Sequence, residues 1–106
     1  MNQFDVHWNT GKNCEAIPFV VLVQSSLFDS YRRRVVIPLV RNSSLSLISD
    51  NRFNPSFSIE NIAVVLHPLE IVSIPVEQLG EFVESLTNEG DSIMDALDEL
   101  LTRAWK

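Results

Sequence analysis

The sequence predicts a small antiparallel β-barrel or β-sheet with one α-helix at its C-terminal end. Three observations predict this class: short apolar and β-branched runs recur along the chain, turn residues separate them, and the apolar period becomes helical only in the last element. The 106 residues suffice for one domain and are too few for two ordinary ones. We therefore expect a single domain over residues 1–106.

The first two expected strands form a β-hairpin. Phe4, Val6 and Trp8 alternate with polar residues, which is typical of a half-buried strand over residues 3–8. Residues 9–13 supply turn chemistry, and residues 17–23 are continuously apolar. Such a continuous run indicates a strand that is covered on both faces or whose outer face meets a partner.

The next expected strand, residues 33–40, begins in the arginine cluster Arg32 to Arg34 and contains Pro38. Because proline donates no hydrogen bond to a ladder, this pattern indicates a strand at a sheet edge. Just before it, residues 27–31 bring large apolar groups into an expected loop. Bulky apolar side chains in a connection indicate a contact surface.

A long, partly irregular excursion rich in serine and asparagine is expected over residues 41–54, ending at Pro55. A β-meander should follow, with a turn at Glu60 and Asn61 between its first two strands. The expected strands are residues 57–59, 62–66 and 70–75.

The last element is an expected helix with one apolar face. Its inward stripe follows the spacing i, i+4, i+7 and i+11 and is widened by two further residues. The stripe comprises Ile93, Leu97, Leu100 and Ala104, with Met94 and Leu101 beside it. Thr87 or Asn88 is the expected N-cap, and the acidic Glu89 and Asp91 favour the positive end of the helix dipole.

Composition excludes several function classes. Hydrophobic residues make up 45% and charged residues 21%, as in globular proteins, and no apolar run approaches the ~20 residues that span a bilayer. The net charge of −6 argues against a nucleic-acid partner held by electrostatics. The single Cys14 forms no internal disulfide, which fits a reduced, cytoplasmic location.

No catalytic, metal or cofactor motif is found in the sequence. His7 and His67 are expected on strand surfaces, and no HExxH, GxSxG or glycine-rich phosphate loop occurs. We therefore expect no metal, no cofactor and no catalytic residues.

Trp105 either packs back on the domain or is exposed for a partner to bind. The second alternative is considered because tryptophan is enriched at binding hot spots.

Two motifs in a fixed order resemble the CcdB family. The first is Val23-Gln24-Ser25 followed by Arg-Arg-Val-Val-Ile-Pro-Leu at 33–39, and the second is Ser-Ile-Pro-Val at 73–76 with Leu79-Gly80. The resemblance extends over nearly the whole chain. It implies an SH3-like barrel with a C-terminal helix, a homodimer, and a toxin of a toxin–antitoxin pair that poisons DNA gyrase.

The resemblance also implies site residues. In the family, the two helix ends lie together at the dimer tip and enter the gyrase A subunit. In this chain, that region corresponds to Thr102, Arg103, Ala104 and Trp105. A CcdA-like antitoxin with a disordered tail should contact Gln24, Ser25, Leu27 and Phe28 and, on the helix, Asp98 and Leu101. The dimer interface is expected at Val72, Leu100 and Leu101, because these apolar residues exceed what one small domain buries.

Two alternatives stay open. MazF and PemK endoribonuclease toxins are similar in fold, and Arg33 or Arg34 would there stabilise a charged phosphorane. The sequence offers no general acid or base beside either arginine, and the net charge opposes RNA binding. The second alternative is a family member that binds an antitoxin but no longer poisons gyrase.

Overall fold

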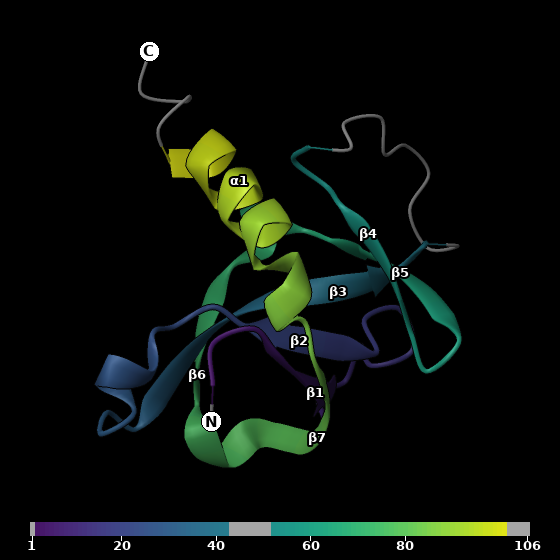
Figure 1. Ribbon diagram of the computed structural model, residues 1–106. Coiled ribbons are helices and arrows are strands. Elements are labelled where there is room, and N and C mark those ends of the chain that lie inside the picture. The colour runs from purple at the N-terminus through teal and green to yellow at the C-terminus, as the bar shows by residue number, and fades with distance from the viewer. Residues whose placement is uncertain (1, 43–51, 102–106) are drawn as a thin grey trace.

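The computed structural model of the chain describes residues 2–42 and 52–101, which form a curled antiparallel sheet with one helix packed against it (Figure 1). The predicted class, mainly β with a C-terminal helix, is confirmed. The strands are β1 (Asp5–Asn9), β2 (Phe19–Leu22), β3 (Arg33–Arg41), β4 (Ser56–Ile59), β5 (Ile62–Leu66), β6 (Val72–Pro75) and β7 (Leu79–Ser85). The helix α1 spans Gly90–Leu101, and short 3-10 turns include η1 (Ser26–Phe28), η3 (Pro68–Glu70), η4 (Val76–Gln78) and η5 (Thr87–Glu89).

Strand β3 lies in the middle of the sheet, so its expected place at an edge is wrong. The order is β4-β5-β3-β2-β1-β7, and β6 also pairs with β3. On the side away from β2, β3 pairs with β6 over residues 33–36 and with β5 over residues 39–41. Pro38 falls between these two partners, and its carbonyl accepts the His67 N–H at 3.1 Å. The missing proline N–H therefore faces the gap between two ladders and interrupts neither.

The segment after Pro55 is only in part the expected meander. Strands β4 and β5 form a hairpin with Ile59 opposite Ile62, and the turn at Glu60 and Asn61 is confirmed. Both turn residues have positive φ, 51° and 62°, as a two-residue hairpin turn requires. Strand β6, however, pairs with β3 and not with β5. Most of the expected excursion over residues 41–54 lies outside the described residues.

Strand β7 was not predicted, and it changes the environment of β1. Among the described strands it pairs with β1 alone, with register shifts on either side of His7. His7 is therefore buried, which corrects its expected surface position, and its Nδ1 lies 2.9 Å from the Gly80 carbonyl oxygen. Strands β7 and β1 approach so closely at Gly80 that a Cβ there would overlap the Trp8 carbonyl oxygen, so glycine is required at this position.

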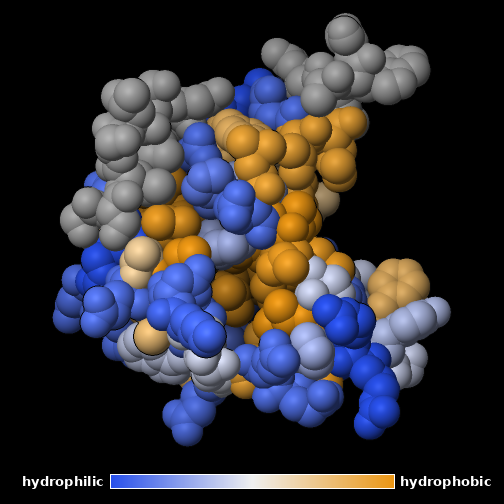
Figure 2. Space-filling view, turned by 180° about the vertical axis from the view of Figure 1, so that it is seen from behind, coloured by the Kyte–Doolittle hydropathy of each residue, from blue (hydrophilic) through white to orange (hydrophobic). Residues whose placement is uncertain are grey.

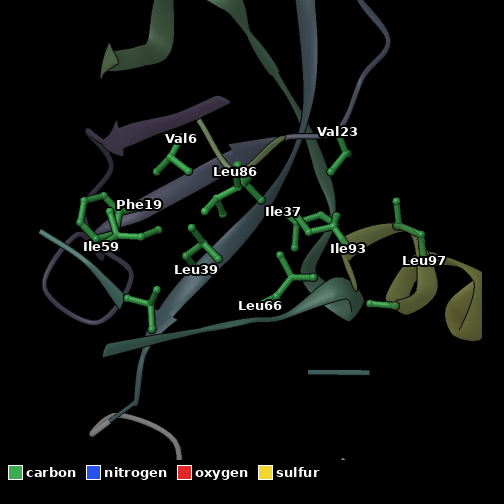
Figure 3. Packing of buried hydrophobic residues seen from close by; sticks show 13 residues of the cluster. Val6, Phe19, Val23, Ile37, Leu39, Ile59, Leu66, Leu86, Ile93 and Leu97 are labelled. Carbon is green, nitrogen blue, oxygen red and sulfur yellow. The ribbon is translucent and has the colours of Figure 1, made fainter. Parts of the chain in front are cut away.

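The core lies between the concave face of the sheet and α1 (Figure 3). Successive residues of β2 point to opposite faces, and all four are buried. Phe19 and Val21 enter the main core, while Val20 and Leu22 join a second cluster with Val36. Of the two alternatives expected for the apolar run, the structure shows the first, a strand covered on both faces. Figure 3 labels Val6, Phe19, Val23, Ile37, Leu39, Ile59, Leu66, Leu86, Ile93 and Leu97.

The helix buries a narrower stripe than its pattern predicts. Ile93, Ala96 and Leu97 are buried, whereas Met94 is 43% and Leu101 69% exposed. Ala104 lies outside the described residues.

The start of the helix also differs from the expectation. Thr87 and Asn88 form the turn η5 before α1 and do not cap it; the Thr87 N–H donates to the Ser85 Oγ at 3.2 Å. Gly90 then begins α1 against the Phe4 ring, where a Cβ would come within 2.8 Å of Cε2. This contact sets the helix close to the start of β1.

Candidate functional site

The connection between β2 and β3, residues 23–32, presents large apolar side chains to solvent; we call it the β2–β3 loop. Leu27 is 85%, Phe28 50% and Tyr31 65% exposed. The Phe28 and Tyr31 rings pack edge to face, with centroids 6.1 Å apart. An exposed apolar group of this size on a loop is typical of a binding surface.

Gln24 and Ser25 shape this loop. The Gln24 Oε1 accepts the Val35 N–H at 3.1 Å, and its Nε2 donates to the carbonyl oxygens of Phe28 (3.2 Å) and Arg33 (3.3 Å). Ser25 Oγ accepts the Leu27 N–H at 3.2 Å and so caps η1. Two of the residues expected to bind an antitoxin therefore fix the position of the other two.

Arg34 stabilises the loop from inside. Its side chain is buried, and its guanidinium donates to the carbonyl oxygens of Asp29, Tyr31 and Arg33. Its Nε lies 3.8 Å from the Asp29 Oδ1. Because these groups surround the guanidinium, Arg34 is not positioned to reach a phosphate group of RNA.

Arg33, the next residue, points the other way. Its side chain is exposed, and it donates from Nε to the Ser73 Oγ (2.9 Å) and from Nη2 to the Ser73 carbonyl oxygen (2.6 Å). These bonds join β3 to β6 beside a solvent-open pocket of about 370 Å³. The pocket is lined by Gln24, Phe28, Tyr31, Arg33, Val35 and Ser73, and we call it the loop pocket.

The loop pocket is suited to binding a ligand, because apolar side chains line it beside the Arg33 guanidinium. Neither histidine lines it. His7 lies under β7, and His67 is half-buried just after β5. Within residues 2–42 and 52–101, no three potential metal ligands gather at one place.

A second apolar surface lies at α1, η3 and the start of β6. Leu69 (62%), Val72 (46%), Met94 (43%) and Leu101 (69%) are all exposed, and η3 packs against α1. Figure 2 shows apolar side chains gathered on this face, in orange, from the upper right to the middle of the molecule. We call these four residues the helix patch. Leu100, expected with Val72 and Leu101 at a dimer interface, is half-buried and packs against the core.

The expected antitoxin residues thus fall into two groups. Gln24, Ser25, Leu27 and Phe28 lie on the β2–β3 loop, and the exposed Asp98 and Leu101 lie on α1, which Figure 1 shows at a separate place on the molecule. The gyrase-binding residues expected from the sequence, Thr102, Arg103, Ala104 and Trp105, lie outside the described residues.

Sequence reasoning missed two parts of these surfaces. Ser73 meets Arg33 only through the pairing of β6 with β3, which no local pattern reveals. Leu69 of the helix patch and the nearby Ile71, which is 37% exposed, lie on either side of the acidic Glu70. From this short pattern an exposed apolar segment could have been predicted.

The comparisons with known proteins agree with these observations. A family model described as CcdB protein matches residues 3–102, nearly the whole chain. No match was found among curated proteins. Within the part of the chain that the structure describes, no helix has the length and apolarity needed to cross a membrane.

Proposed function

Since this chain belongs to the CcdB family and is a CcdB-like toxin of a toxin–antitoxin system, we propose that it binds the A subunit of DNA gyrase and traps the cleaved-DNA complex. The observation that carries this proposal is the family match over residues 3–102, which includes both sequence motifs and all of α1. The exposed apolar surfaces add support, because they suit a protein that acts by binding and is not itself an enzyme. Its proposed place of action is the cytoplasm.

The proposed gyrase contact is the end of the C-terminal helix, with Thr102, Arg103, Ala104 and Trp105. Trp105 should contribute most, because a large aromatic side chain supplies much buried area to an interface. Trp105→Ala should therefore abolish gyrase trapping and leave the melting temperature nearly unchanged. Lys106→Ala is the matched control, since it alters the neighbouring terminal residue and keeps the indole. A lower melting temperature with unchanged trapping would instead indicate that the ring packs on the domain.

The proposed antitoxin is a CcdA-like protein whose disordered tail binds Gln24, Ser25, Leu27 and Phe28 on the loop and Asp98 and Leu101 on α1. A segment that folds on binding needs apolar anchors to offset its ordering entropy. The exposure of Leu27 and Phe28 on a hydrogen-bonded loop supports this assignment.

We also propose a homodimer whose interface includes Val72, Leu100 and Leu101. Val72 and Leu101 belong to the helix patch, whose exposed apolar side chains suit an obligate interface. Leu100, next to Leu101 in α1, is half-buried and packs against the core.

One experiment tests the proposed activity. The protein is incubated with gyrase, supercoiled plasmid and ATP, and linear DNA linked to protein is expected to accumulate. Antitoxin binding without such DNA would indicate a member that no longer poisons gyrase. Degradation of added RNA would indicate the ribonuclease activity of the MazF class.

A further inference from the structure

The exposed guanidinium of Arg33 lines the loop pocket, although the chain as a whole is acidic. The net charge is −6, yet Arg32 and Arg33 lie next to one another in the sequence with exposed side chains. Neither forms an ion pair with another described residue. The rim of the pocket is therefore a local site for a negative group on a protein that otherwise repels one.

Arg33 keeps hydrogen-bonding capacity that the fold does not use. A guanidinium has five N–H donors, and the bonds to Ser73 involve Nε and Nη2 only. Its Nη1 has no partner among residues 2–42 and 52–101. Because Ser73 anchors one side of the group, the free donors are held in place beside the pocket, which favours binding of a planar carboxylate.

The pocket next to these donors is apolar and already formed. Phe28, Tyr31 and Val35 provide its walls. Gln24 fixes the backbone at Phe28 and Val35, and the buried Arg34 fixes it at Tyr31. Binding of a partner would therefore require little further ordering of the β2–β3 loop, and the loss of conformational entropy on this side of the contact would be small.

We propose that the loop pocket binds a large apolar side chain of an acidic peptide segment, with a neighbouring carboxylate of that segment on the Arg33 guanidinium. The inference rests on the proposed antitoxin binding and specifies its chemistry: the tail that reaches this loop is acidic. A basic segment would be repelled by the Arg33 guanidinium, and the net charge of −6 opposes the approach of a nucleic acid.

The test uses two labelled synthetic peptides and fluorescence anisotropy. In one peptide, glutamates flank a single phenylalanine, and in the other, glutamines replace the glutamates. The acidic peptide should bind about fivefold more tightly at low salt, the size expected for a charge-assisted hydrogen bond at a partly exposed site. Arg33→Gln should remove this preference. Lys12→Gln makes the same charge change at an exposed turn and should keep it.

Equal affinity for the two peptides, no binding of either, or the same loss in Lys12→Gln would overturn the inference. If Arg33→Gln melts at a lower temperature, Tyr31→Ala provides a second test. The Tyr31 ring is 65% exposed and forms a wall of the pocket, so it should be needed for the binding of both peptides. In the unchanged protein, the acidic peptide should shift the NMR amide signals of Phe28, Val35 and Ser73; shifts confined to other elements would also overturn it.

Failure here and failure of the proposed function are distinguishable. If the antitoxin binds the unchanged protein and Arg33→Gln equally well, only the acidic pocket is refuted. If the antitoxin does not bind the unchanged protein at all, the proposed antitoxin function is refuted, while the peptide comparison still decides the pocket.

Discussion

Replacing Arg34 with methionine tests whether the buried guanidinium holds the β2–β3 loop in place. Methionine has a similar length and no charge, so the change removes three hydrogen bonds to carbonyl oxygens and one ion-pair contact of the Asp29 carboxylate. The Asp29 side chain is 35% exposed, so water can solvate its charge, and the cost comes mainly from the carbonyl oxygens that lose their donor, about 2–4 kcal/mol of unfolding free energy in all. For a domain near 100 residues this should lower the melting temperature by at least about 8 °C.

The neighbouring Arg33 provides the matched control. Arg33→Met also removes two hydrogen bonds and one positive charge, but at an exposed side chain. Water can replace those bonds, so the expected loss is only about 1 kcal/mol. Thermal unfolding followed by circular dichroism, with urea unfolding for the free energies, measures both variants. Equal losses would refute the reasoning, because burial would then add nothing to the contribution of Arg34.

The remaining predictions concern a loop, an interface and a glycine. Phe28→Ala should weaken antitoxin binding by about 1–3 kcal/mol in calorimetry, because the exposed ring would fill a pocket of the complex; unchanged affinity would remove it from that site. Leu101→Arg should shift the dimer towards monomer in sedimentation experiments, since the charge would be desolvated without a partner, and an unaltered mass would contradict this interface. Gly80→Ala should destabilise the fold by about 1–3 kcal/mol, because its Cβ would overlap the Trp8 carbonyl oxygen. Gly11→Ala is the control, because Gly11 is exposed and the atom nearest to a Cβ there, the Asn9 Oδ1, is 3.2 Å away and not in overlap; equal melting temperatures for the two variants would be the contrary result.

Local sequence patterns predicted those elements whose cause is local. The apolar run of β2, the hairpin turn at Glu60 and Asn61 and the inward stripe of α1 through Ile93 and Leu97 all follow from periodicity and turn chemistry. The exposed loop at Leu27 and Phe28 was also visible as bulky residues in a connection. The resemblance carried by the two motifs predicted the family that the match over residues 3–102 shows.

Features that depend on long-range pairing were decided only by the tertiary structure. Pro38 is tolerated in a central strand because two partners meet beside it, and His7 is buried because β7 covers β1. The arginines 33 and 34 look equivalent in sequence, yet one lines a pocket and the other is enclosed by carbonyl groups. A period of two residues determines that neighbouring side chains point to opposite faces of a strand. Which face is then covered depends on strands far away in the sequence, and no local pattern specifies them.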